Sequence, residues 1–271
     1  MTAPARTLPV PFPPLHRELL GSYLHRLADA NHLTIGGLSR EIGPGRHHRR
    51  DSDDTDGWTP AAVTRLAVLA GTTAPALLHA LPVLQAIAPA GQEAARPSLP
   101  AWHAHACLLC AARRGASGLA IIRVFPHEKI CGLHSRWHGG GPQRPLQDLL
   151  PEIPNANALH RRLARRHGTA AATGHYLQAQ AQTRQWLAGD SPADLKSSWK
   201  RRLRLLGEDP YGDPHRPSPD RIELVTYPET VTMTKLALAH VPLHTDTLAE
   251  TLRPEVSSVL SMPRPQPPIQ T

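Results

Sequence analysis

Cysteine, aromatic residues and long apolar runs are all scarce in this sequence. Its 271 residues include three cysteines, and such a small, odd number argues against a disulfide framework. Aromatic residues make up 4% of the chain, which argues against an aromatic-rich β-sandwich. The most apolar stretch, residues 61–90, is interrupted by Arg65, Gly71 and Pro75, so it predicts no membrane-spanning helix.

The first residues lack the apolar core of a signal peptide. They read "MTAPARTLPVPFPP" and are broken by proline, whereas a signal peptide needs an uninterrupted apolar segment. We therefore expect a soluble, cytoplasmic protein without membrane contact, in a compartment that keeps its thiols reduced.

Motifs of the common enzyme classes are also missing. The sequence contains no phosphate-binding Gly-x-x-x-x-Gly-Lys-Ser/Thr loop and no His-Glu-x-x-His metalloprotease helix. It has no Gly-x-Ser-x-Gly nucleophile elbow either. These absences favour a non-catalytic binding protein. An enzyme with an unrecognised site, for example a nuclease, is the alternative that they leave open.

Proline and glycine are abundant, at 29 and 19 residues, and this predicts short helices with many interruptions. Thr34, Thr59 and Thr73 are expected helix N-caps, and the helix over residues 190–207 is expected to begin at Asp190 or Ser191. Residues 118–125, "GLAIIRVF", are the only β-like run in their region. We expect a mainly α protein, with helix-turn-helix-like helical units around a small zinc-ribbon or zinc-finger module.

The composition divides the chain into five segments. These are an N-terminal helical domain (1–95), a zinc-binding module (96–145), a basic helical domain (146–207), a linker with C-terminal helices (208–252) and a disordered tail (253–271). Helices are expected over residues 17–34, 34–43, 59–71, 73–84, 157–168, 175–189, 190–207, 227–242 and 244–254. The stretch 208–221 is expected to be linker.

All three cysteines lie between Ala106 and His134, in "ACLLCAARRGASGLAIIRVFPHEKICGLH". Cys107 and Cys110 form a Cys-x-x-Cys pair, and Cys131 and His134 repeat the same spacing. We call these two short turns the first knuckle (Cys107 to Cys110) and the second knuckle (Cys131 to His134). Together they supply the four sulfur and nitrogen ligands of a structural zinc, and such a zinc has no position left for a reactive water. A redox pair or inert thiols are the alternatives. For the fourth ligand, His103, His105, His127 and His138 are alternatives to His134.

The positive charge is concentrated in one segment. Residues 158–206 hold ten Lys or Arg against Asp190 and Asp194, an excess equal to the +8 of the whole chain. Cations on a helix face neutralise nucleic-acid phosphates, whereas an ordinary solvated helix surface is the alternative. The residues expected to contact nucleic acid are Arg161, Arg162, Arg165, Arg166, Lys196, Lys200, Arg201, Arg202 and Arg204.

Residues 18–43, "ELLGSYLHRLADANHLTIGGLSREIG", resemble the N-terminal signature of the TniQ family, Glu-Ser-Leu-x-Ser-x-Leu-x-Arg-Leu-Ala. The matching positions are Glu18, Leu20, Ser22, Leu24, Arg26, Leu27 and Ala28. Leu19 replaces the usual serine, and Leu108 replaces the proline that usually follows the first cysteine. The stretch "TRLAVLAGTTAPALLHALPVL" and the two knuckles are similar to further family signatures. The resemblance extends to about residue 150.

This resemblance implies a non-catalytic transposition accessory protein. Members of the family act as target-site adaptors, which link DNA or a DNA-recognising complex to an AAA+ transposition ATPase and its transposase. A homodimer is one assembly that the sequence leaves open. A stand-alone zinc-containing helix-turn-helix DNA-binding regulator is the alternative function.

Overall fold

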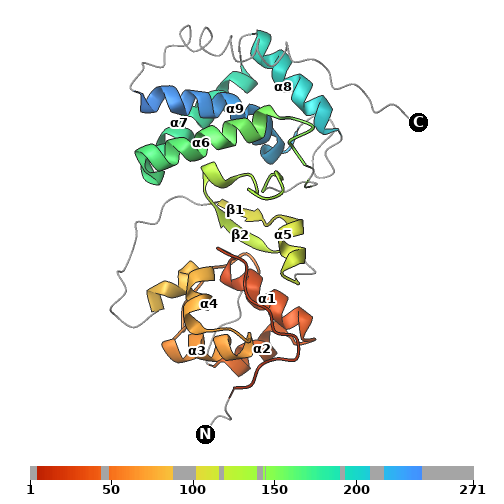
Figure 1. Cartoon of the computed structure of the whole chain (residues 1–271), viewed down its shortest axis with the longest axis vertical. Helices are drawn as coiled ribbons and strands as arrows, with labels where there is room; N and C mark the ends of the chain where they lie inside the picture. The colour runs from red at the N-terminus through yellow and green to blue at the C-terminus, as the bar shows by residue number, and fades with distance from the viewer. Residues whose placement is uncertain are drawn as a thin grey trace, which may run out of the picture. The chain divides into compact units, whose positions relative to one another are not determined.

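The protein is described by a computed structural model, and its helices dominate the fold (Figure 1). The structure describes residues 5–43, 49–87, 102–115, 119–138, 143, 145–189, 193–207 and 217–239. Contacts group the chain into two compact units, one within residues 1–125 and 138–143 and the other within 126–137 and 144–271. The expected fold class, mainly helical with a small Cys/His module, is confirmed. The limits of the five sequence-based segments stay a prediction.

Four short α-helices form the N-terminal part of the first unit. They are α1 (Leu20–Ala30), α2 (Ile35–Ile42), α3 (Pro60–Leu69) and α4 (Ala74–Ala80), followed by the 3₁₀ turn η1 (Pro82–Ile87). The expected caps are confirmed, since Thr34, Thr59 and Thr73 each accept a hydrogen bond from a backbone N–H three residues later. A core of buried leucines joins the four helices.

Helices α3 and α4 have the geometry of a helix-turn-helix. Their axes differ by 97°, within the range of about 90–120° typical of that motif. Gly71 in the turn has a φ of +63°, a conformation that glycine adopts at little cost. Among the described residues, no single helix is long and apolar enough to cross a membrane. Helices α3 and α4 together have that length and apolar character, but they are bent by 97°.

The loop before α3 provides the cap of α1. Leu19, the N-cap residue, makes no side-chain capping bond, but Asp53 Oδ1 accepts a hydrogen bond from the Leu20 N–H at 2.8 Å. The Gly21 N–H donates to the Ser52 carbonyl at 2.9 Å. A Cβ on Gly21 would lie 1.8 Å from the Arg49 carbonyl oxygen, so only glycine fits here. Leu19 itself is fully buried. At the position of the family's usual serine, this chain therefore has an apolar core residue, and Asp53 provides the helix cap instead.

The polar signature residues Glu18, Ser22 and Arg26 form one buried network. Arg26 donates to both carboxylate oxygens of Glu18, at 2.7 and 2.8 Å, and Ser22 Oγ donates to the same carboxylate at 3.0 Å. Ser22 Oγ also accepts a bond from the Ile121 N–H at 2.9 Å. A buried charge needs such partners, so these three residues connect α1 to the neighbouring strand.

That strand belongs to a small antiparallel sheet. β1 (Trp102–His105) pairs with β2 (Ile121–Val124), with Trp102 opposite Val124, and residues 17–19 hydrogen-bond to the other edge of β2. The β-like run is therefore confirmed at 121–124. The pairing strand "WHAH" was not foreseen, because four residues are too short to show a clear alternation.

The second unit is a bundle of four longer helices. They are α6 (Glu152–His167), α7 (Thr169–Ala188), α8 (Ala193–Leu206) and α9 (Pro219–Leu238). Helix α9 packs against the other three (Figure 1) and is buried along most of its length. Gly168 and Gly207 end α6 and α8 as expected, with φ values of +85° and +72°. The expected cap at 190–191, the helix at 244–254 and the tail lie outside the described residues.

Three helices, α6, α7 and α9, begin earlier than the sequence predicts, and α7 starts at Thr169 instead of residue 175. Helix α6 starts at Glu152 and contains Pro154 in its first turn, where the missing N–H has no helical partner to lose. Helix α9 starts at Pro219, inside the expected linker, and contains Pro228. In α6 and α9 the packing of the bundle outweighs the local effect of these prolines.

A neutral histidine lies in the core of this bundle. His160 is fully buried, and its Nδ1 lies 3.0 Å from the Tyr227 hydroxyl. That hydroxyl donates its proton to the Pro126 carbonyl, so His160 Nδ1 carries the hydrogen and donates it. Its Nε2 has no hydrogen-bond partner among the residues that the structure describes. Burial, together with nearby His127, lowers the pKa of His160 to about 3.

This histidine should make folding stability depend on pH. Its pKa is lower in the folded state than in the unfolded state, so the unfolded chain binds the extra proton between the two values and acid favours unfolding. We expect the free energy of unfolding to fall by up to about 1.4 kcal/mol per pH unit as pH drops from about 6 to about 4. Urea unfolding of His160→Gln should lack this part of the slope, whereas the exposed control His167→Gln should retain it. Equal slopes in all three proteins would contradict the assignment.

Candidate metal centre

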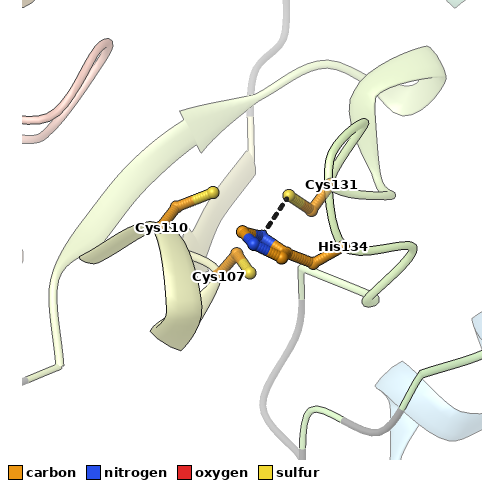
Figure 2. Close-up of side chains that lie close together, drawn as sticks. All are labelled: Cys107, Cys110, Cys131 and His134. Atoms are coloured by element: carbon orange, nitrogen blue, oxygen red, sulfur yellow. Dashed lines mark hydrogen bonds between the residues drawn. The ribbon is translucent and has the colours of Figure 1, made fainter. Parts of the chain in front are cut away.

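Cys107, Cys110, Cys131 and His134 converge into one group (Figure 2). One potential ligand atom from each residue lies within 4.8 Å of the other three. The Cys131 Sγ lies 3.6 Å from the His134 Nδ1. All three cysteines are free of disulfides. The group could therefore hold a metal ion.

The spacing of these atoms fits a tetrahedral ion. With metal–sulfur and metal–nitrogen distances of about 2.3 and about 2.1 Å, a sulfur–nitrogen edge of the tetrahedron measures about 3.6 Å and a sulfur–sulfur edge about 3.8 Å. The 3.6 Å between Cys131 and His134 equals the first value. The other ligand atoms lie at most 4.8 Å apart, so these distances need to shorten by no more than about 1 Å to match the edges of the tetrahedron. Three sulfurs and one imidazole are also the donor set that suits zinc.

The first knuckle is held by a glutamine outside the motif. Cys107 is the N-cap residue of the short helix α5 (Leu108–Arg113). On either side of it, the Gln143 Oε1 accepts from the Leu108 N–H at 2.7 Å and the Gln143 Nε2 donates to the Ala106 carbonyl at 2.7 Å. The amide of Gln143 thus fixes the backbone on both sides of a ligand. Sequence reasoning missed this residue, because nothing local marks it.

The second knuckle is a tight turn that packs on the helical bundle. The Cys131 N–H donates to the Arg136 carbonyl at 2.8 Å, and the Ser135 N–H donates to the Cys131 carbonyl at 2.9 Å. Ile130 and Trp137, which flank the turn, belong to the bundle's hydrophobic core. The Asn157 side chain of α6 donates to the His127 carbonyl at 3.2 Å. This knuckle is therefore part of the second unit.

The other four candidate histidines lie outside the group. His103 is exposed on β1, and the His138 Nδ1 lies 3.4 Å from the His105 carbonyl oxygen. The His127 ring lies 5.9 Å from the ring of His160. The structure thus brings His134, and none of these alternatives, together with the three cysteines.

The nine basic residues expected to contact nucleic acid occupy different environments. Arg202 is buried, at 4% exposure, and its guanidinium donates to Glu152 and Glu229. Arg161 is half-buried and donates to the backbone carbonyls of His127 and Ile130, just before the second knuckle. Both guanidinium groups are therefore bound inside the bundle. The other seven are exposed or half-buried: Arg162, Arg165, Arg166, Lys196, Lys200, Arg201 and Arg204.

These seven residues fall into two groups rather than one. Arg201 on α8 donates to Glu152 at the beginning of α6, at 2.8 Å. Arg165 lies thirteen residues further along α6, which is about 20 Å at the helical rise. Lys196, Lys200 and Arg204 are spaced one turn apart along one face of α8. The bundle thus presents a basic row on α8 and a separate basic end on α6.

A mostly helical protein with a Cys₃His group is the class that fold and site define. Residues 9–137 match the model of the family described as TniQ, so this part of the chain belongs to the TniQ family and the resemblance is confirmed. The matched region includes all four potential ligands. No curated protein and no solved structure matches the chain. The family is one of non-catalytic accessory proteins, and it associates the chain with transposition.

Proposed function

We propose that the chain is a target-site adaptor of a transposition system, without catalytic activity of its own. In this role it links DNA, or a complex that recognises DNA, to an AAA+ transposition ATPase and its transposase. The observation that carries the proposal is the family match over residues 9–137, which contains both the helix-turn-helix-like part and the Cys₃His group.

The metal is proposed to be zinc in a structural role. Cys107, Cys110, Cys131 and His134 would fill all four positions of a tetrahedral ion, so the ion would supply no open position for substrate or water. Such an ion stabilises a small module that has little core of its own. The buried cluster around the sheet is small and contains Leu15, Ala106, Ala111 and Ala120. This small core supports a stabilising role for the metal.

The basic surfaces of the second unit are proposed to contact nucleic-acid phosphates. Lys200 and Arg204 on α8 and Arg162, Arg165 and Arg166 on α6 extend into solvent. Phosphate contacts of this kind give affinity that depends on salt but little on sequence. Such affinity is sufficient for an adaptor whose place on the DNA is chosen by other components.

The stand-alone regulator is supported by one observation, the 97° arrangement of α3 and α4. A helix-turn-helix regulator reads bases with its second helix. Helix α4 has the sequence "APALLHA" and contains no Lys or Arg, so it lacks the side chains that most often bind guanine. This composition favours the adaptor over the regulator.

Charge reversal tests the DNA contacts. We expect the triple variant Lys196→Glu, Lys200→Glu and Arg204→Glu to bind duplex DNA about 100-fold or more weakly at about 0.1 M salt, because three phosphate contacts are lost. The plot of log affinity against log salt concentration should become shallower by about three. Fluorescence anisotropy with a labelled duplex measures both quantities.

Two further variants complete this test. The triple Arg162→Glu, Arg165→Glu and Arg166→Glu reports on the separate basic end of α6. Arg40→Glu, an exposed residue of α2, is the control and should leave both affinity and slope unchanged. Binding that all three variants leave intact would remove the basic helices from the mechanism. Recruitment of the ATPase to DNA only when the chain is present would then separately test the adaptor role.

A further inference from the structure

The Arg161 guanidinium lies against the backbone of the second knuckle. Its Nε donates to the His127 carbonyl at 3.3 Å, and its Nη2 donates to the Ile130 carbonyl at 2.9 Å. A Cβ on Gly132 would lie 3.2 Å from the Arg161 Nη1, so the small residue between the two ligands leaves room for this side chain. Arg161 therefore faces the residues on both sides of Cys131.

We propose that Arg161 is a positioning residue for Cys131 and His134, an inference that rests on the proposed metal site. The Ile130 carbonyl belongs to the peptide unit that leads directly into Cys131. A planar guanidinium that donates to two carbonyls fixes their relative orientation, which a single flexible donor does not do. Helix α6 thus holds the second knuckle in the conformation that presents its ligands. The metal therefore binds with a smaller loss of conformational entropy in this turn.

A second residue of α6 also binds the backbone just before the second knuckle. Asn157, one helical turn before Arg161, donates to the same His127 carbonyl at 3.2 Å. Arg162, Arg165 and Arg166 on the same helix are exposed and make no such contact with the knuckle. One face of α6 therefore supports the metal turn, while another face carries the proposed phosphate contacts.

The charge of Arg161 acts in the same direction. Three thiolates, one neutral imidazole and one divalent ion would carry a net charge of −1. A half-buried guanidinium beside this turn stabilises the anionic centre, and outer residues that orient or neutralise ligands commonly change metal affinity by about 10–100-fold.

Metal titration of the full-length protein tests this role. We expect Arg161→Met, which keeps the apolar stem but removes the donors, to raise the dissociation constant for Zn²⁺ by about 10–100-fold. The absorption bands of the Co²⁺-loaded variant should shift, because its ligands are less well oriented. The milder Arg161→Lys retains the charge but not the planar fork, so it should weaken binding by a smaller factor.

Two controls separate positioning from general destabilisation. Arg162→Met removes the exposed neighbouring arginine. Thr183→Ala removes a buried hydroxyl that bonds to Gln180 and Thr230 elsewhere in the bundle. Both should leave Zn²⁺ affinity and the Co²⁺ spectrum unchanged, although Thr183→Ala should lower stability.

The outcomes distinguish this inference from the proposed function. A wild-type protein that takes up no metal would overturn the zinc site and the role of Arg161, but not the adaptor role, which rests on the family match. If wild type binds one metal ion and Arg161→Met binds it equally well, only the inference about Arg161 fails. If Arg161→Met binds DNA more weakly and its salt dependence becomes shallower by about one, Arg161 is a phosphate contact instead.

Discussion

Replacing Cys131 with serine is expected to remove the metal and to produce the largest loss of stability of any single substitution in the chain. The purified wild-type protein should contain about one zinc ion per chain, and the variant less than about a tenth of that. A serine hydroxyl is a poor zinc ligand, so three donors would remain. Elemental analysis of the dialysed proteins measures the difference directly.

The expected loss follows from the link between metal binding and folding. Structural zinc contributes on the order of 10 kcal/mol to the folding of small zinc modules. We expect removal of the ion, by substitution or by a chelator, to lower the free energy of unfolding by at least about 5 kcal/mol. In a chain of this size that corresponds to at least about 10 °C in Tm. Adding zinc back should restore wild-type Tm after chelation but not after the substitution.

Histidine variants provide matched controls for this experiment. His134→Gln should behave like the Cys131 variant, whereas His103→Gln and His138→Gln should retain the metal, since neither belongs to the convergent group. A fully folded, metal-free wild-type protein with three titratable thiols would contradict the zinc site. A protein whose Cys107 and Cys110 cycle between dithiol and disulfide would support the redox alternative.

The parts of the fold that depend on local chemistry could be predicted from the sequence. Thr34, Thr59 and Thr73 were predicted as caps because a cap bonds to an N–H three residues away. The knuckle spacing pointed to the same four side chains that converge in the structure, because each pair of ligands is local.

The contacts that sequence reasoning missed act over long separations. Asp53 caps α1 from 33 residues away, and Gln143 holds the first knuckle from 35 residues away. Arg161 reaches the Ile130 carbonyl across 31 residues. No periodicity identifies such partners, because spacing indicates which face of a helix is buried but not what lies opposite it.

Arg202 is the exception, because a local signal did mark it. The apolar side chains of Leu195, Trp199 and Leu203 recur every four residues, a spacing that predicts the buried stripe of α8. Leu195, Trp199 and Arg202 also share one helix face, at spacings of four and three, and the structure buries all three. The charge of Arg202 led to its assignment to the surface, although its position is that of a core residue.

Replacing Arg202 with methionine is expected to lower the free energy of unfolding by about 3–5 kcal/mol. The Arg202 Nε donates to Glu152 at 3.1 Å and its Nη1 donates to Glu229 at 2.8 Å. Burial lowers the pKa of Arg202, but Glu229 and Glu152 outweigh this effect and raise it overall. The guanidinium thus remains charged, and its removal would leave Glu229 without a cationic partner and Glu152 with Arg201 alone. Urea unfolding measures the change.

Two variants define the cause of this loss. Arg204→Met, on the exposed side of the same helix, should change the free energy of unfolding by no more than about 0.5 kcal/mol. Combining Arg202→Met with Glu152→Gln and Glu229→Gln removes both buried carboxylate charges and should recover part of the loss. A single Arg202→Met variant that is as stable as Arg204→Met would contradict the buried ion network.

The same substitution separates stability from DNA contact. At a temperature where Arg202→Met remains folded, its DNA affinity should depend on salt with the wild-type slope, because a guanidinium bound to Glu152 and Glu229 neutralises no phosphate. A slope that becomes shallower by about one would instead place Arg202 among the phosphate contacts. Charge reversal at Arg202 cannot make this distinction, since a buried glutamate beside two others would unfold the bundle and abolish binding indirectly.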